Sequence, residues 1–149
     1  MRPILIASDH AGYRLKEKLK PYIEKNGLKV KDLGTYSAKR CDYPDFAYRL
    51  AKEISAKRFT RGILICKSGI GNSIVANRLK GVRAALCYNL KAARLSREHN
   101  DSNVLVLGAA FVNEKIAKTI VRVWLETKFT GGRHRRRLNK IAAIENKIV

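Results

Sequence analysis

Cys66 is the residue of this sequence with the clearest potential for chemistry. It ends an apolar run and is followed by a glycine-containing loop, Lys67-Ser68-Gly69-Ile70-Gly71, that opens a helical pattern. Backbone N–H groups of such a loop and the positive end of a helix dipole favour negative charge. We therefore expect a pKa below the free-thiol value of about 8.5, which would make Cys66 a base or nucleophile rather than a small buried residue at a strand end.

The loop after Cys66 could also bind a phosphate group, and spacing tests two known loops of that kind. A P-loop would need glycine in place of both Arg61 and Cys66, and a cysteine phosphatase loop would need arginine in place of Asn72. The sequence has neither pattern. What remains is a loop whose backbone amides can stabilise an anion such as an enediolate.

Two histidines, each beside a polar residue, follow other predicted elements. Asp9 and His10 come directly after the first apolar run and would lie beside the Cys66 loop if the first and third strands are neighbours. His99 and Asn100 close the fourth helical segment, where the helix dipole favours a charged imidazole. An isolated histidine is more often a surface or packing residue, but this pairing indicates that both lie at the functional rim of the fold.

A basic run, Arg133 to Arg137, begins a last helical pattern after two glycines. Cations at a helix start oppose the helix dipole, so a nearby anion would relieve that cost. Arg133 and Arg137 are four residues apart and share a face, which suits a paired grip on a phosphate dianion. A solvated basic turn and contact with a nucleic-acid backbone are the alternatives.

The elements that must position these residues follow from the hydrophobic pattern. Apolar runs recur at 3–7, 28–33, 62–66, 82–87 and 103–107, and segments of helical period lie at 13–25, 44–57, 70–79, 90–98 and 114–126. Continuously apolar strands indicate a sheet with both faces covered, and their alternation with helices predicts an α/β fold with a parallel, right-handed, doubly wound sheet. Ligands of such sheets bind beyond the carboxyl ends of the strands.

Length and composition indicate one domain over residues 1–149, because 46% of the chain is hydrophobic and no repeat or linker divides it. No signal-peptide pattern or membrane-length apolar stretch occurs, which predicts a cytoplasmic protein without membrane contact. Cys41, Cys66 and Cys87 lie far apart and form no CxxC or Cys/His cluster. We therefore expect reduced thiols, no metal and no cofactor.

The formal charge of +20 would attract phosphates of any kind, including those of nucleic acids. Much of it lies at helical spacing beside apolar residues, as in Leu15-Lys16-Glu17-Lys18-Leu19-Lys20, which is typical of a solvated helix face. A nucleic-acid site would also need exposed aromatic residues or a recognisable binding motif. The sequence offers neither, so nucleic acid is not the partner we expect.

Seven motifs, in order along the chain, give the sequence a specific likeness to a known family. They are 8–12 (SDHAG), 42–45 (DYPD), 62–66 (GILIC), 68–71 with 76–78 (SGIG and ANR), 81–85 (GVRAA), 96–101 (SREHND) and 131–134 (GGRH). On these motifs the chain resembles the type B ribose-5-phosphate isomerases, in the group that also includes galactose-6-phosphate and allose-6-phosphate isomerases. The likeness covers nearly the whole chain. It implies a Rossmann-like three-layer α/β/α sandwich with a five-stranded parallel sheet.

The resemblance also implies an assembly and a reaction. The assembly would be a homodimer, able to pair into a tetramer, with active sites at the subunit interface and the C-terminal helix reaching the partner subunit. Ribose 5-phosphate and ribulose 5-phosphate would interconvert through an enediolate, as a step of the pentose phosphate pathway and without a metal. His99 would open the sugar ring with help from Asp9, and Cys66 would move the proton between C2 and C1.

Substrate-binding roles come from the same resemblance. The amides of residues 67–71 would hold the enediolate; the hydroxyls would be oriented by Asp9, His10 and Asn100, and the phosphate held by Arg133 and Arg137. Two positions depart from the family pattern: Lys67 replaces a common glycine, and Ala110 replaces an arginine that many members use for phosphate. They leave open a six-carbon substrate, allose or galactose 6-phosphate. The high charge leaves open a non-catalytic binder of sugar phosphates or nucleic acid.

Overall fold

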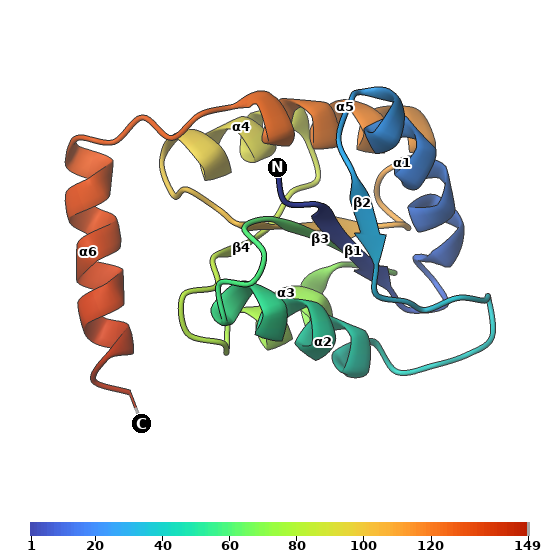
Figure 1. The fold of residues 1–149 in the computed structure, drawn as a ribbon, viewed down its shortest axis with the longest axis horizontal. Coiled ribbons are helices and arrows are strands. Elements are labelled where there is room, and N and C mark those ends of the chain that lie inside the picture. Colours follow the sequence, from blue (N-terminus) through green and yellow to red (C-terminus); the bar gives the residue numbers. More distant parts are fainter. Residues whose placement is uncertain (149) are drawn as a thin grey trace.

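A parallel sheet forms the centre of the computed structural model, which describes residues 1–148 (Figure 1). The strands of the described chain are β1 (Ile4–Ser8), β2 (Val30–Asp32), β3 (Gly62–Cys66), β4 (Ala84–Leu86) and β5 (Val104–Gly108). Their order in the sheet is β2-β1-β3-β5-β4, and every neighbouring pair is parallel. All strands therefore begin at one edge, the amino edge, and end at the other, the carboxyl edge.

Helices cover both faces of this sheet. Within residues 1–148 they are α1 (Tyr13–Lys25), α2 (Tyr43–Ser55), α3 (Ile70–Ala76), α4 (Leu90–Glu98), α5 (Glu114–Glu126) and α6 (Arg133–Glu145). Figure 1 shows α1, α4 and α5 on one face and α2 and α3 on the other. Two hydrophobic cores correspond to the two faces. The predicted Rossmann-like three-layer sandwich is confirmed.

The strand sequences explain why two cores form. β1, β3 and β5 are buried at every position, and successive side chains of a strand point to opposite faces. Ile63 and Ile65 therefore join the core under α1 and α5, whereas Leu64 joins the core under α2. β2 and β4 lie at the sides of the sheet and keep only three residues each, so the runs predicted at 28–33 and 82–87 were too long.

Helix limits agree with the sequence where an asparagine caps the helix. The side chains of Asn89 and Asn113 accept hydrogen bonds from the backbone N–H groups of Ala92 and Ile116, each at 2.8 Å, at the starts of α4 and α5. α3 ends at Ala76 rather than at residue 79.

α6 stands beside the sandwich, on the left of Figure 1, and covers neither face of the sheet. His134 and Leu138 are its two buried residues, whereas Ile141 and Ile144 are 49% and 58% exposed. Glu145 accepts a hydrogen bond from the backbone N–H of Gly81 at 2.9 Å. The helix thus presents large apolar side chains to solvent, a feature that commonly marks an interaction surface.

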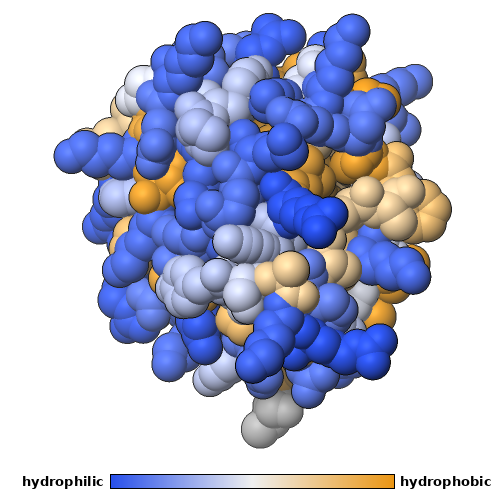
Figure 2. Space-filling view, turned by 90° about the vertical axis from the view of Figure 1, so that its right-hand side faces the viewer, coloured by the Kyte–Doolittle hydropathy of each residue, from blue (hydrophilic) through white to orange (hydrophobic). Residues whose placement is uncertain are grey.

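Charged side chains cover much of the molecule, and Figure 2 shows one largely hydrophilic face with small hydrophobic groups between. Lys16 is an exception to the solvated helix face expected from the sequence: it is fully buried, and its ammonium lies 2.6 Å from the Asp32 carboxylate. The hydrogen bond from Lys20 to Asp32 raises the pKa of Lys20 to about 12. Among residues 1–148, no helix combines the length and apolarity needed to cross a membrane.

Candidate active site

Cys66 ends β3 at the carboxyl edge of the sheet and is 4% exposed. The backbone N–H of Gly69 donates a hydrogen bond to the Cys66 sulfur at 3.2 Å. Gly69 has a φ of +82°, which suits glycine, and a side chain there would collide with Leu86. The loop therefore turns tightly over the sulfur and directs backbone amides toward it, as an anion-stabilising loop requires.

The protonation of Cys66 differs from the expectation. Burial raises the pKa of the thiol above its ordinary value, and the negative charge of Asp9 adds to the rise. Hydrogen bonds from the backbone of Asn72, Gly69 and Ser68 lower the pKa but do not compensate for burial. The prediction of a depressed pKa was wrong, because the sequence does not reveal how deeply the sulfur is buried.

Asp9 and His10 lie beside the Cys66 loop, because β1 and β3 are neighbours, which was the condition set in the sequence analysis. Asp9 is buried, and its carboxylate accepts a hydrogen bond from the backbone N–H of Gly12 at 3.0 Å. A Cβ atom at Gly12 would lie 2.5 Å from the carbonyl oxygen of Ile65, so glycine allows this turn to approach β3. The Nδ1 atom of His10 lies 3.2 Å from the backbone nitrogen of Cys41, which orients the imidazole.

Three side chains around this loop were not predicted as site residues. The ring of Tyr43 lies so close to Gly71 that a Cβ atom there would be 2.7 Å from the phenol oxygen. The Tyr88 hydroxyl donates to the carbonyl oxygen of Ser68 at 2.8 Å. The Ser8 hydroxyl, at the end of β1, is buried and has no hydrogen-bond partner in the described chain. Ser8 and Tyr43 belong to motifs that carried the resemblance, which was the signal for them.

The two departures from the family pattern lie together at the mouth of the loop. The backbone N–H of Ala110 donates to the carbonyl oxygen of Lys67 at 2.9 Å, and both residues are exposed. No carboxylate of residues 1–148 lies within 4.0 Å of the Lys67 ammonium. Lys67 therefore adds an unpaired positive charge close to the place where many relatives are expected to carry arginine.

His99 and Asn100 lie at the amino edge, away from Cys66. The chain passes from them into the start of β5, where the carbonyl oxygen of Asn103 accepts a hydrogen bond from Gly62, the first residue of β3, at 2.9 Å. The length of β3 from Gly62 to Cys66 is about 13 Å at roughly 3.3 Å per residue. The expectation that His99 and His10 share one rim was therefore wrong within a single chain, because α4 returns the chain to the amino edge.

The predicted phosphate-binding arginines accompany His99 rather than Cys66. His134, in the first turn of α6, is buried and stacks on His99 with ring centroids 4.1 Å apart and an angle of 12° between the planes. Arg133 and Arg137 are exposed on the same helix. One chain thus holds the candidate site residues in two separate groups, which we call half-sites: a thiol half, comprising Asp9, His10 and residues 66–71, and a histidine half, comprising His99, Asn100, Arg133, His134 and Arg137.

Comparison with known proteins assigns the chain to a family. The family described as Ribose/Galactose Isomerase matches residues 4–141. The chain belongs to this ribose/galactose isomerase family. Ribose-5-phosphate isomerase B of Escherichia coli is 42% identical over 147 residues, which are 99% of each chain.

Solved structures of the ribose/galactose isomerase family match the fold closely. Ribose-5-phosphate isomerase B of Clostridium thermocellum gives a TM-score of 0.95 at 46% identity, over 98% of this chain and 99% of that protein. The Mycoplasma genitalium ribose-5-phosphate isomerase B with bound ribulose-5-phosphate gives 0.93 at 40% identity, over 98% and 97% of the two chains. The match therefore spans both half-sites.

His134 is the residue of this family member's histidine half that sequence reasoning missed. Burial lowers the pKa of its imidazole, and the charges of His99, Arg133 and Arg137 lower it further. The lowered pKa favours the neutral imidazole of His134, so the ring can stack on His99 without adding a positive charge. Among residues 1–148, no three His, Cys, Asp or Glu side chains are grouped so that they could hold a metal ion.

Proposed function

We propose that the protein interconverts ribose 5-phosphate and ribulose 5-phosphate. The observation that carries the proposal is the Cys66 sulfur, which lies under the Gly69 amide and near the buried Asp9 carboxylate in a chain of the ribose/galactose isomerase family. The similar Mycoplasma genitalium protein, solved with bound ribulose-5-phosphate, supports the choice of substrate.

Cys66 acts in this proposal as the base that moves one proton. Its thiolate removes the proton from C2 of the open-chain aldose, the electrons of that C–H bond form the C1–C2 double bond, and the oxygen on C1 becomes anionic. The amides of residues 67–71 stabilise this enediolate. The hydroxyl proton then passes from the C2 oxygen to the C1 oxygen, and the thiol returns its proton to C1. A thiol with a raised pKa forms less thiolate, but that thiolate is a stronger base.

The other roles require a second copy of the chain. The two half-sites must meet for these roles to be filled. His99 opens the ring with assistance from Asp9, and Asp9, His10 and Asn100 orient the hydroxyls. Arg133 and Arg137 bind the phosphate. A symmetric dimer brings the histidine half of one subunit to the thiol half of its partner, and does so twice. The exposed Ile141 and Ile144 of α6 support such an interface.

We further propose that residues 1–149 form one catalytic domain that works in the cytoplasm. Three free cysteines are consistent with a reducing compartment. The site needs no cofactor, because proton transfer between two carbons uses only a base and a stabilised enediolate.

A coupled isomerase assay with ribose 5-phosphate tests this function directly. Turnover that survives a chelator and falls by about 10²- to 10⁴-fold in the Cys66→Ala variant is expected for loss of a general base. Nearly unchanged turnover in that variant would contradict the role of Cys66.

A six-carbon substrate is the second candidate, and Lys67 is the observation that favours testing it. Its unpaired charge at the mouth of the loop changes how a phosphate would be held. Comparing kcat/KM for ribose 5-phosphate, allose 6-phosphate and galactose 6-phosphate, in the natural chain and in a Lys67→Gly variant, decides between the sugars. A sugar phosphate that binds without any turnover would instead indicate a non-catalytic sensor.

A further inference from the structure

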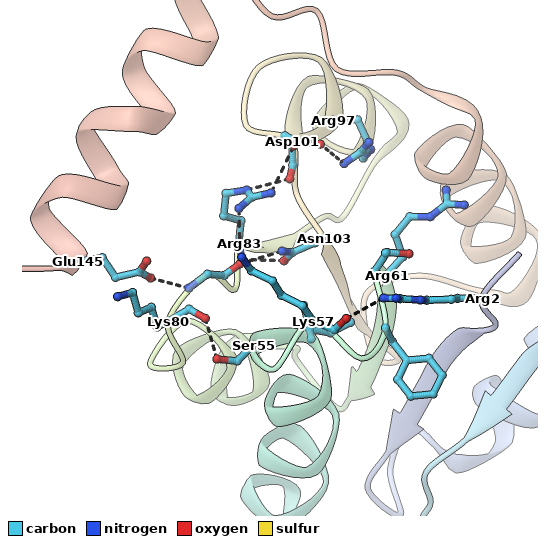
Figure 3. Close-up of a pocket in the computed structure, with 14 residues that line it drawn as sticks. Arg2, Ser55, Lys57, Arg61, Lys80, Arg83, Arg97, Asp101, Asn103 and Glu145 are labelled. Atoms are coloured by element: carbon cyan, nitrogen blue, oxygen red, sulfur yellow. Dashed lines mark hydrogen bonds and ion pairs between the residues drawn. The ribbon is translucent and has the colours of Figure 1, made fainter.

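A cavity lies at the amino edge of the sheet, on the side opposite Cys66. This amino-edge cavity has a volume of about 760 Å³. Its walls come from the segment before β1, the ends of α2 and α4, the turns that lead into β3, β4 and β5, and the end of α6. The charged residues that line it are Arg2, Lys57, Arg61, Lys80, Arg83, Arg97, Asp101 and Glu145. Figure 3 shows Glu145 approaching from α6 on the left, and Arg2 and Arg61 on the right.

Positive charge exceeds negative charge in this cavity. Its six cations face two carboxylates, which leaves a net charge of +4 on the described lining. Asp101 is shared by two of the cations, since its carboxylate lies 3.3 Å from Arg83 and 2.9 Å from Arg97. Glu145 accepts a hydrogen bond from the backbone N–H of Gly81.

The four remaining cations have no carboxylate within 4.0 Å among residues 1–148. They are Arg2, Lys57, Arg61 and Lys80. A concave site lined by one sign of charge focuses its potential on whatever ion enters it. The cavity thus offers several unpaired donors to one anion.

Main-chain contacts hold two of these cations in place despite their mutual repulsion. Arg2 donates to the carbonyl oxygen of Lys57 at 2.7 Å, and Arg61 donates to the carbonyl oxygen of Leu125 at 3.0 Å. Arg61 is partly buried, and burial together with the charge of Arg97 lowers its pKa. Carbonyl oxygens orient these guanidinium groups but leave their charge uncompensated. A bound anion would therefore lower the free-energy cost of burying Arg61 and offset the repulsion between the cations.

We infer that the amino-edge cavity binds an oligophosphate, an anion with two or three linked phosphate groups, either inorganic or carried by a nucleotide. One phosphate dianion would balance only half of the net +4, whereas a diphosphate or triphosphate balances most of it and spans several donors. Phe59 and Ile54 also line the cavity and give a nucleotide base an apolar surface. None of the residues in this site belongs to the thiol half or the histidine half.

Isothermal titration calorimetry with inorganic tripolyphosphate, at about 0.15 M salt where long-range surface attraction is screened, tests the site. We expect one anion per chain. A Lys57→Ala/Lys80→Ala variant should bind at least about tenfold more weakly, because it loses two charge-assisted contacts. A Lys25→Ala/Lys29→Ala variant removes the same charge from exposed positions outside the cavity and should bind within about twofold of the natural protein. Circular dichroism checks that both variants fold.

A second arm compares inorganic pyrophosphate with ADP. Equal affinities for pyrophosphate and ADP would show that the site recognises the diphosphate alone. Tighter binding of ADP would show that the site also contacts the nucleotide base. Both results support the site. An absence of saturable binding, or equal weakening in the two lysine variants, would overturn it. Loss of tripolyphosphate binding in an Arg133→Ala/Arg137→Ala variant would also overturn it, because the anion would then occupy the histidine half.

Discussion

His99 and His134 stack face to face, with ring centroids 4.1 Å apart and planes inclined by 12°. The contact joins the end of α4 to the first turn of α6, so the helix that carries Arg133 and Arg137 also orients the imidazole of His99. In the proposed function, proton transfer by His99 and phosphate binding by Arg133 and Arg137 would therefore depend on the same contact between α4 and α6.

Loss of this stack should impair turnover without removing any group that contacts the substrate in our proposal. We expect a His134→Ala variant to lose about two- to tenfold in kcat/KM, since an aromatic pair contributes roughly 0.5–1.5 kcal/mol and about 1.4 kcal/mol corresponds to tenfold. A His134→Phe variant keeps an aromatic ring against His99 and should recover most of the activity. Equal losses in the two variants would indicate that His134 acts by its nitrogen atoms instead.

The low pKa of His134 should also make stability depend on pH. Burial and the neighbouring His99, Arg133 and Arg137 lower the pKa of this imidazole in the folded protein, whereas in the unfolded chain it titrates near its ordinary pKa of 6.5. The unfolded state therefore binds more protons below that pH, and stability is lost as the pH falls. We expect Tm to drop more steeply as the pH falls below 6.5 in the natural protein than in His134→Phe. Parallel slopes would contradict this assignment.

The raised pKa of Cys66 predicts the pH profile of the reaction. The base must be deprotonated, and the thiol holds its proton beyond the ordinary range because it is buried. kcat/KM, which reports the free enzyme, should therefore climb about tenfold per pH unit from pH 7 to about 8.5. A plateau that begins below about pH 8 would mean that the loop amides outweigh burial in solution.

Much of the fold was predictable because its pattern is local. The limits of α1, α4 and α5 and of β3 agree with the sequence to the residue, since apolar periodicity and the asparagines before α4 and α5 mark them. β2 and β4 were predicted too long because apolar residues at the sides of a sheet continue beyond the paired segment. The neighbouring positions of β1 and β3, which place Asp9 near Cys66, were left open by the sequence, because doubly wound sheets occur with more than one strand order.

The features that were not predicted from the sequence depend on how deeply a side chain is buried and on the edge of the sheet at which it lies. The pKa of Cys66 shifts upward because its sulfur is buried, and no spacing rule reports burial. His99 was expected beside His10 because both are histidines next to polar residues, yet α4 carries it to the opposite edge. Lys16 sits within a charged helical pattern but is fully buried against Asp32. These residues show that the hydrophobic pattern predicts helices and strands more reliably than it predicts the burial and contacts of a single side chain.

Gly12 is a position where a single methyl group should disturb the thiol half. A Cβ atom there would lie 2.5 Å from the carbonyl oxygen of Ile65, which is backbone and cannot move aside alone. We expect Gly12→Ala to cost about 1–3 kcal/mol of stability by overpacking and to displace the Asp9 turn, with lower kcat/KM. Urea unfolding and the isomerase assay measure both effects.

Gly27→Ala is the control for that variant. Gly27 has a φ of +87° but open space around it, so alanine should cost roughly 1–2 kcal/mol of backbone strain while activity stays unchanged. Full activity in Gly12→Ala would contradict the view that the turn must approach β3 closely.

The division of one chain into a thiol half and a histidine half predicts complementation between inactive chains. A Cys66→Ala chain keeps its histidine half, and an Arg133→Ala/Arg137→Ala chain keeps its thiol half. In a mixed dimer one of the two sites combines the intact halves and the other combines both defects. If equal amounts are unfolded together and refolded, half of the dimers are mixed, so we expect about one quarter of the natural activity from two inactive parents.

A matched mixture shows whether such rescue reflects sharing of sites across the dimer. Cys66→Ala and Asp9→Asn both damage the thiol half, so every site in their mixed dimers carries one defect and no activity should return. Rescue in the first mixture and none in the second is what an active site built from two subunits requires. If neither mixture regains activity although mixed dimers are present by mass spectrometry, then His99 and the α6 arginines do not serve the partner's Cys66. The roles proposed for them would have to be abandoned, because within one chain they lie at the opposite edge of the sheet.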